Sequence, residues 1–315
     1  MAKGYFFSRR RYERCTRLFR SPKTAYALSL IPARWPLKFT LVNGDTLQLG
    51  VGRRSRRIWS WLLESWPDPG PITVEDGLVR IHCGEKSYLL RPNYGDFMVF
   101  GEIMVHDVYN LGSLPATTGT VVDLGANIGL FSLRAAQSAQ RVIAVEPVES
   151  NLQLAEKILA EGGARDKVAL VKAAICGESG GTVRVYASPN FPAGNSIFES
   201  HALRWSVNQY EDVARLSLAD LFEQEQVEHC GLLKCDIEGA EFEALQAAPL
   251  ELLKRIDHIV IEVHMNIASG SRQKLARLRN RLEAAHFRVS HPKETRWWGG
   301  LRGAITMNAR NRRAA

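Results

Sequence analysis

From about residue 119 onward, short apolar runs alternate with segments whose apolar residues recur at helical spacing. The runs VVDLG, RVIAVE, VALVKAA, GLLKCDIE and DHIVIEVH have the length and β-branched content of buried strands. TVRVYA, ARLSL, FRVSH and GAITMNA are further candidate strands. Apolar strands that alternate with amphipathic helices are typical of a parallel sheet covered on both faces. The sequence therefore predicts an α/β fold with a doubly wound, mostly parallel sheet.

The first 114 residues have a different pattern. Residues 37–49, LKFTLVNGDTLQL, form a candidate hairpin around Asn43-Gly44, and residues 72–91 give two or three more short strands. RIWSWLLESW (57–66), FGEIMVHDVYNL (100–111) and a basic stretch at 5–20 are candidate helices. We expect three parts: a basic N-terminal segment (1–36), a small β-rich extension (37–114) and the α/β domain (115–315).

Charge is unevenly distributed along the chain. Residues 1–60 contain 14 Lys or Arg against 2 Asp or Glu, and residues 295–315 contain 5 Arg and no acid. The net charge of the whole chain is only +8, so the region between these ends is acidic. Basic ends of this kind suit an anionic surface or nucleic acid, and they also occur as solubilising tails.

Other features of the sequence bear on location. No apolar run approaches the roughly 20 residues that span a bilayer, and the N-terminus lacks the order of a signal peptide. The five cysteines have no metal-type spacing. We expect a cytoplasmic protein without a transmembrane segment, and the basic N-terminus leaves peripheral contact with a membrane open.

The stretch VVDLGANIGLFSL, residues 121–133, predicts a strand, a glycine turn and a helix. Free backbone N–H groups at the start of that helix suit a polar or anionic ligand. Glu146 ends the next strand, 21 residues beyond Gly125, where a carboxylate can accept hydrogen bonds from both ribose hydroxyls. The chain has neither G-x-G-x-x-G nor G-x-x-x-x-G-K-[ST] spacing. These features favour an adenosine-type ligand other than a dinucleotide or a nucleoside triphosphate.

VVDLGANIGLFSL, followed by AVEPVESN, resembles the first motifs of class I S-adenosylmethionine methyltransferases. LLKCDIEGAEFEAL, IVIEVH and the upstream RPNYGDFMVFGEI are similar to segments of the FkbM family, so that the likeness covers about residues 88–264. One departure is Ser217-Leu218-Ala219, where the family usually has Thr-Leu-Asp and this chain has its acid one place later, at Asp220.

The resemblance implies a seven-strand-type, Rossmann-like methyltransferase sheet, S-adenosyl-L-methionine as cofactor, and O-methylation of hydroxyls on natural products, sugars or glycolipids. It places four residues around the methionine part of the cofactor, one at the ribose and one of two alanines near the adenine: Asp123, Gly125, Asn127 and Gly129, then Glu146, then Ala173 or Ala174.

Methyl transfer to an alcohol needs alignment of the acceptor with the methyl carbon and a base for the hydroxyl proton. Asp236 and Glu238 end one predicted strand, where they share a face if the strand continues that far, and Glu262 and His264 end the next. We expect these four side chains to gather at the ligand-binding edge of the sheet. Asp236 or His264 would be the base, while Glu238 and Glu262 would orient the acceptor.

Each of these residues also has an ordinary alternative, as a helix cap or a structural hydrogen-bonding group. A divalent metal held by Asp236, Glu238 and His264 is a rival interpretation, and we predict that no metal is bound. Glu241 and Glu243 fall just inside the following helix, where acids suit the helix dipole, so we expect both to be structural.

Residues 188–201, SPNFPAGNSIFESH, are either a lid over the substrate, with Asn195 and Ser196 as polar contacts, or an ordinary surface loop. Arg91 is a tentative substrate contact, and with Glu102 it either reaches the cofactor edge or forms an ion pair. Trp297 and Trp298 either stack on a sugar or pack in the core.

Together these features predict an S-adenosylmethionine-dependent O-methyltransferase acting on a small molecule, sugar or glycan. The alternatives are a nucleic-acid methyltransferase that uses the basic N-terminus, and a catalytically inactive protein that binds an anionic surface. No RNA-binding module and no amino-methylation signature is legible, so we do not expect nucleic acid as a partner. The loop spacing also disfavours a nicotinamide oxidoreductase.

Overall fold

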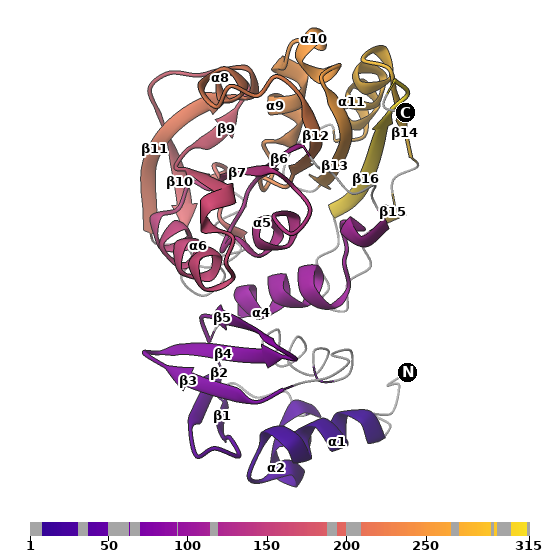
Figure 1. Ribbon diagram of the computed structural model, residues 1–315. Coiled ribbons are helices and arrows are strands. Elements are labelled where there is room, and N and C mark those ends of the chain that lie inside the picture. The colour runs from indigo at the N-terminus through magenta and orange to yellow at the C-terminus, as the bar shows by residue number, and fades with distance from the viewer. Residues whose placement is uncertain are drawn as a thin grey trace. The chain divides into compact units, whose positions relative to one another are not determined.

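The computed structural model of the protein (Figure 1) describes residues 8–30, 37–49, 63, 70–92, 94–113, 119–187, 194–199, 209–265, 271–290, 293–294 and 304–313. These residues form two compact units, one up to Val108 and the other from Tyr109 onward. No helix within the described ranges is both long and apolar enough to cross a membrane.

The first unit combines short helices with two small antiparallel sheets. β1 (Leu37–Thr40) and β2 (Thr46–Leu49) form the predicted hairpin, and β3 (Ile72–Glu75), β4 (Leu78–Cys83) and β5 (Lys86–Leu90) form a three-stranded meander. The predicted basic helix is α1 (Arg9–Leu18), and a second helix that we did not predict, α2 (Pro22–Leu30), follows it. Of the helix predicted at 57–66, only Leu63 is described, and its side chain is buried.

The helix predicted at residues 100–111 has the wrong bounds. α4 (Tyr94–Phe100) begins six residues earlier and continues into a π-helical turn, η1 (Gly101–Val105). Asp107 and Asn110 then adopt positive φ angles of 48° and 53°, which right-handed helical backbone does not allow. The helix therefore ends before the predicted C-terminus, at a backbone reversal that the apolar pattern does not reveal.

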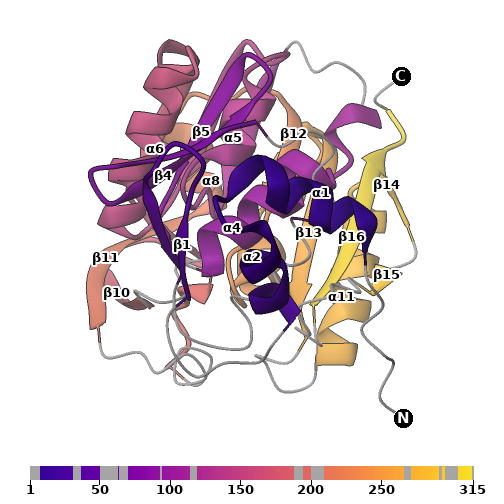
Figure 2. The same cartoon turned by 90° about the horizontal axis from the view of Figure 1, so that it is seen from below.

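The second unit is built on a mostly parallel sheet in the order β14-β16-β13-β12-β6-β7-β8. Within this sheet, β6, β7, β8, β12 and β13 pair in parallel with one another. β16 pairs antiparallel with β13 and β14 (Figures 1 and 2). A short strand, β15, also pairs with β16. The strands are β6 (Thr120–Leu124), β7 (Arg141–Val145), β8 (Val168–Val171), β12 (Cys230–Cys235), β13 (Ile256–His264), β14 (Phe287–Val289), β15 (Lys293–Glu294) and β16 (Ala304–Asn311).

This order confirms the predicted doubly wound sheet and locates its switch point. The chain adds β7 and β8 on one side of β6, then returns to add β12 and β13 on the other side. Ligands of open α/β sheets bind beyond the carboxyl ends of the strands at such a reversal. The turns that follow β6 and β12 therefore face the expected binding site.

Helices cover both faces of this sheet (Figure 1). α5 (Leu130–Ala135) and α6 (Glu149–Glu161) pack together on one face. On the other, Ile143, Leu233 and Ile261 of the strands form a core with Phe242 and Leu245. The helices on this second face are α8 (Leu218–Gln224), α9 (Glu241–Ala247), α10 (Leu250–Leu253) and α11 (Ser271–Ala284). A 3-10 turn, η2 (Leu111–Ser113), precedes the sheet, and another, η3 (Arg165–Lys167), precedes β8.

The predicted strand VALVKAA is in fact two strands in different sheets. After β8 the chain leaves the central sheet, and β9 (Ala174–Cys176) pairs with β11 (Gln209–Ser217), which pairs in turn with β10 (Thr182–Ala187). Ser217 then caps α8: its hydroxyl accepts from the Asp220 backbone N–H at 3.1 Å. The departure at Ser217-Leu218-Ala219 thus forms an N-terminal helix cap.

Candidate active site

The glycine loop, residues 125–129, joins β6 to α5 at the switch point. Gly125 has a φ of +79°, and a Cβ atom there would lie 1.8 Å from the main-chain oxygen of Asp236. Gly129 has a φ of +78° directly before α5, and a Cβ atom there would lie 3.0 Å from the Ala155 side chain. Side chains at either position would be strained and crowded. The predicted glycine turn therefore brings the loop after β6 into direct contact with the loop after β12.

A buried ion pair holds these two loops together. The Nζ atom of Lys234, a residue only 2% exposed, donates to Asp123 Oδ1 at 3.0 Å and to the Gly125 carbonyl at 2.9 Å. The second Asp123 oxygen accepts from the Ser132 hydroxyl at 2.7 Å. Burial lowers the pKa of Lys234, but the charges of Asp123 and Asp236 outweigh it and raise that pKa overall. Both Asp123 oxygens thus bond to protein groups, and its contact with a cofactor stays a prediction.

Sequence analysis missed Lys234, although a signal was present. Every residue of β12 is buried, and Lys234 stands alone among its apolar neighbours in GLLKC. A lysine is rarely buried unless it is paired. Its position in an apolar strand therefore indicates a partner carboxylate on an adjacent strand, and β6 supplies one in Asp123, which lies directly opposite Lys234 in the register.

Glu146, the predicted ribose ligand, is buried at the end of β7 and fixes the glycine loop. Its carboxylate accepts from the backbone N–H of Asn127 at 2.9 Å, from that of Val148 at 3.0 Å and from Asn151 Nδ2 at 2.9 Å. Burial raises the pKa of Glu146, and these three donors oppose that rise. The Asn127 side-chain oxygen is buried and has no hydrogen-bond partner among the described residues. A buried acceptor of this kind needs a donor, and a polar ligand in the loop would supply one.

The two alanines predicted near the adenine lie just beyond β8. Val171, the last residue of β8, accepts through its carbonyl from the Glu146 backbone N–H at 3.1 Å, so this chain segment lies beside Glu146. The side chains of Ala173 and Ala174 are both buried in hydrophobic clusters. Their contact with a cofactor stays a prediction.

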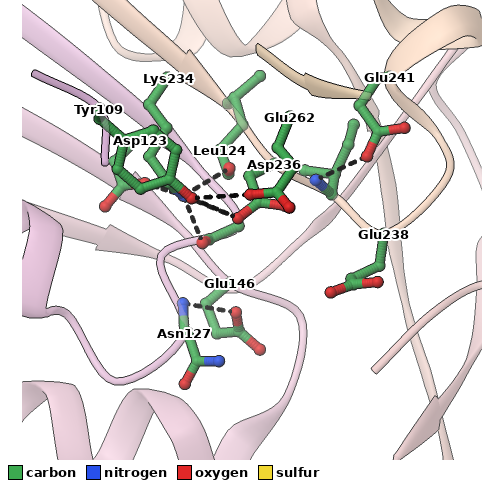
Figure 3. A network of polar contacts seen from close by, with 12 residues as sticks. Tyr109, Asp123, Leu124, Asn127, Glu146, Lys234, Asp236, Glu238, Glu241 and Glu262 are labelled. Atoms are coloured by element: carbon green, nitrogen blue, oxygen red, sulfur yellow. Dashed lines mark hydrogen bonds and ion pairs between the residues drawn. The ribbon is translucent and has the colours of Figure 1, made fainter. Parts of the chain in front are cut away.

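The four predicted acceptor-side residues, Asp236, Glu238, Glu262 and His264, do come together, and we call them the acid–histidine cluster. Figure 3 shows the three acids of this cluster. His264 Nε2 lies 3.3 Å from Glu238 Oε2, and ligand atoms of Asp236, Glu238 and His264 lie within 4.8 Å of one another. The hydroxyl of Tyr109 donates to Asp236 Oδ2 at 2.8 Å and lies 3.5 Å from Glu262 Oε2. Tyr109 therefore connects the two carboxyl groups, and we did not predict its role.

One condition attached to the predicted cluster, that the strand continues to Glu238, is not met. β12 ends at Cys235, so Asp236 and Glu238 do not share a face of that strand. They lie in the turn before α9, where Glu238 has a φ of 50° and Gly239 one of 110°. The left-handed backbone at these two residues ends the strand and redirects the chain. Glu262 and His264, by contrast, do lie within β13.

Burial and the charges of neighbouring side chains shift the pKa values of Glu262 and His264. Burial, reinforced by the neighbouring charge of Asp236, raises the pKa of Glu262 to about 8. Burial lowers the pKa of His264, but the carboxylates of Glu238 and Glu241 outweigh it and raise that pKa well above its usual value. Burial and the neighbouring charges therefore favour the protonated form of Glu262 at neutral pH, and the carboxylates favour the charged form of His264.

Glu241, which we expected to be only a helix-terminal acid, contacts the cluster. It is 0% exposed, and its Oε1 atom lies 2.8 Å from His264 Nδ1. The same oxygen accepts from the backbone N–H groups of Ile237 at 3.2 Å and Gly239 at 3.0 Å. Glu243, the other acid of this helical turn, is exposed. The two glutamates therefore have different environments: Glu241 organises the turn and holds His264.

Comparison with known proteins agrees with this geometry. The profile of the family described as "Methyltransferase FkbM domain" matches residues 123–289, which is more than half of the chain. The chain belongs to the FkbM methyltransferase family. It is thus a methyltransferase, and the matched region contains the glycine loop, the ion pair and the acid–histidine cluster.

Two curated fungal proteins are similar to this FkbM methyltransferase. "Methyltransferase sdnD" of Sordaria araneosa is 28% identical over 211 residues, which cover 58% of this chain and 80% of that protein. "Methyltransferase 1" of Beauveria bassiana (strain ARSEF 2860) is 24% identical over 208 residues, which cover 60% of this chain and 80% of that protein.

Among solved structures, a methyltransferase FkbM from Methylobacillus flagellatus KT aligns at 17% identity with a TM-score of 0.41. The alignment covers 64% of this chain and 46% of that one, so the FkbM methyltransferase described here spans less than half of its length. At such values the likeness says nothing further about function.

The side-chain atoms that would bind a metal in this cluster already have protein partners. Both ring nitrogens of His264 face carboxylates, those of Glu241 and Glu238, and Asp236 accepts from Tyr109. Three side chains within 4.8 Å of one another are nevertheless close enough to converge on an ion. Our expectation that the FkbM methyltransferase uses no metal stays a prediction.

The remaining predicted contacts have mixed outcomes. Of residues 188–201, only 194–199 are described. Ser196 is buried, and its hydroxyl donates to the main-chain oxygen of Glu238 at 2.6 Å; Asn195, beside it, is half-buried. Ser196 of the predicted lid segment thus contacts the turn that contains Glu238. A substrate contact by Asn195 or Ser196 stays a prediction.

Arg91 belongs to the first unit and forms a two-pronged ion pair with the buried Asp96, with both N–O distances at 2.9 Å. The sequence analysis suggested Glu102 as its alternative partner, and the structure identifies Asp96. Trp297 and Trp298 lie outside the described residues.

Proposed function

We propose that this methyltransferase transfers the methyl group of S-adenosyl-L-methionine to a hydroxyl of a small molecule, sugar or glycan. The observation that carries the proposal is the contact between Gly125 and the main-chain oxygen of Asp236, because it joins the cofactor side of the site to the acceptor side. A methyl donor held by the glycine loop would present its sulfonium beside the acid–histidine cluster. An acceptor held by the cluster would then be within reach for in-line attack.

On the cofactor side, the environments of three predicted residues support a role for each. The unpartnered Asn127 oxygen would accept from the amino group of the methionine part. The Glu146 oxygens have further lone pairs beyond their three protein donors, so they would still accept from the ribose hydroxyls. Asp123 would act indirectly, through Lys234 and the carbonyl of Gly125.

On the acceptor side, the chemistry requires that a proton leave the hydroxyl as the new carbon–oxygen bond forms. S-adenosyl-L-methionine would supply the methyl group when bound, and its sulfur would leave as a neutral thioether. Asp236 and His264 are the two groups that would take the proton. Glu238 and Glu262 would hold the acceptor, and the protonated Glu262 carboxyl would donate a hydrogen bond at neutral pH.

The proposed cofactor is tested by calorimetric titration with S-adenosylhomocysteine. We expect micromolar binding to the wild type, loss of binding in Glu146→Ala, and no heat with NAD. Glu149→Ala is the matched control, because Glu149 lies three residues away and is exposed on the surface. Absence of binding to a folded wild-type protein would contradict the proposal. Binding that survives Glu146→Ala would preserve the cofactor but move the ribose elsewhere.

The acceptor class is tested by transfer of labelled methyl groups to a panel of sugars, glycolipids and phenolic natural products. Exposed arginines on α1, Arg9, Arg10 and Arg17, are the described part of the basic N-terminus that suits an anionic surface. If RNA were the acceptor, its binding would weaken steeply as salt increases. Cofactor binding without methyl transfer to any of these would favour the inactive, surface-binding alternative.

A further inference from the structure

We propose that Glu241 is a positioning residue that fixes the tautomer and orientation of His264, so that Nε2 of His264 is the atom that takes the acceptor proton. This proposal rests on the proposed function for the identity of the transferred proton. The arrangement of Glu241 and His264, however, is testable without any acceptor.

The hydrogen bonds of Glu241 determine which ring nitrogen carries the proton. Backbone N–H groups can only donate, and two of them, from Ile237 and Gly239, point at Glu241 Oε1. Because Oε1 accepts from both of these N–H groups, it is the acceptor in its contact with His264 as well. His264 Nδ1 must therefore be the donor across the 2.8 Å contact. In the neutral ring, Nε2 is then left as the proton acceptor.

The same three contacts also fix the ring in space. Glu241 is fully buried at the start of α9, while His264 is the last residue of β13, so the bond joins a helix to a strand of the central sheet. Two backbone donors prevent the carboxylate from turning away from the ring. Because the ring is held in this way, its Nε2 atom points toward Glu238.

The surroundings favour His264 over Asp236 as the base. The Asp236 carboxylate already accepts from Tyr109 at 2.8 Å and lies 4.0 Å from Lys234 Nζ. His264 Nε2 lies 3.3 Å from the Glu238 carboxylate, and the Glu238 side chain is 20% exposed. A partly exposed side chain at the end of a turn can move to admit a hydroxyl. We therefore assign Asp236 to orientation and His264 to proton transfer.

The charges that face the ring determine the pH at which it can act. Glu262 of β13 is mostly uncharged at neutral pH, and the charges that act on the ring are the carboxylates of Asp236 and Glu238 from the turn and of Glu241 from α9. They stabilise the charged ring, so the neutral form that accepts a proton is reached only as the pH rises. A bound sulfonium would oppose this effect and favour the neutral ring. Methyl transfer should accordingly increase with pH up to a plateau.

The decisive experiment is nitrogen NMR of the histidine rings in labelled full-length protein, with the His264 signals assigned by His264→Gln. In the wild type at alkaline pH, we expect a proton on Nδ1 and none on Nε2. Glu241→Gln should lower the midpoint of the His264 titration by about one to three pH units, the usual effect of removing one close carboxylate. Glu243→Gln, which removes an exposed acid from the same helical turn, should leave the midpoint unchanged.

Several outcomes would overturn the proposal. If the neutral ring of the wild-type protein carried its proton on Nε2, the proposal would be wrong. This test does not depend on whether Glu241→Gln folds. An unchanged midpoint in a folded Glu241→Gln variant would overturn the proposal as well. Selective broadening of the His264 signals by micromolar Mn²⁺ would show that the cluster binds a metal ion next to the ring, which would favour the metal interpretation over a free base. Because none of these readouts requires methyl transfer, they are independent of a failure of the proposed function.

A kinetic arm tests the link to catalysis, with an acceptor found in the methyl-transfer panel. Glu241→Gln should reduce the plateau rate at least about tenfold, given the usual contribution of a positioned base. It should also shift the midpoint of the pH–rate profile to lower pH, in parallel with the NMR titration. Unchanged kinetics in a variant whose NMR midpoint has moved would separate His264 from the reaction.

Discussion

Replacing Lys234 by methionine should destabilise the second unit more than any exposed lysine replacement. The change removes the cation that Asp123 needs, yet it keeps the apolar stem that packs within β12. A buried Asp123 carboxylate would then have only the Ser132 hydroxyl as a partner, and the carbonyl of Gly125 would lose its donor. Breaking one side of a buried ion pair typically costs about 3–5 kcal/mol. That is a large share of the roughly 5–15 kcal/mol by which domains are stable.

The measurement is urea unfolding of four variants beside the wild type: Lys234→Met, Asp123→Asn, the double variant and a surface control. Lys172→Met is the matched control, because Lys172 pairs with Glu149 at 2.8 Å on the surface, where such pairs contribute about 0–1 kcal/mol. The double variant Asp123→Asn with Lys234→Met should recover part of the loss, since it leaves no uncompensated buried charge. If Lys234→Met lost less than about 1 kcal/mol, or if the double variant lost the sum of the single losses, the ion-pair reasoning would be wrong.

Two further predictions concern the loop contact and the shifted carboxyl group. Gly125→Ala should abolish S-adenosylhomocysteine binding measured by calorimetry, because its Cβ would lie 1.8 Å from the Asp236 carbonyl; wild-type affinity would contradict the close approach of the loops. For Glu262, the folded-state pKa of about 8 exceeds the usual value of 4.5, so the folded protein keeps a proton that the unfolded chain has released. Stability from this group is therefore lost as pH rises from about 5 to 8, by up to about 1.4 kcal/mol per pH unit. Urea unfolding of Glu262→Gln should show a weaker decline over that window, and an identical decline would count against the shift.

The strands that could be predicted are those whose pattern depends only on local burial. β6, β7, β12 and β13 are mostly buried, so each reads as a mainly apolar run with polar residues near or just beyond its carboxyl end. Asp123 and His264 lie at or near the ends of β6 and β13, whereas Glu146 and Asp236 directly follow β7 and β12. Because parallel strands end at one edge of the sheet, their convergence followed from the alternation of strands and helices alone.

The order of the strands could not be derived in the same way. Nothing in the local pattern states that β12 pairs with β6, and that pairing is what places Lys234 opposite Asp123. It also places the turn of Asp236 against Gly125. Tyr109 is harder still, because its hydroxyl contacts Asp236 across 127 residues of chain, from a segment that the apolar pattern wrongly predicts to be helical. Contacts of this kind depend on the whole topology.

Glu241 lies between these cases, because the sequence contained a signal that the dipole argument ignored. Both Glu241 and Glu243 suit the start of a helix, so the dipole does not distinguish them. Helical phase does: Leu245 lies four residues after Glu241 and therefore on the same face, and Leu245 is an apolar core residue, whereas Glu243 lies on the opposite side. An acid on the apolar face of a short helix must find donors inside the protein. Applied to α9, that reasoning predicts a buried partner for Glu241, and the adjacent strand β13 supplies it in His264.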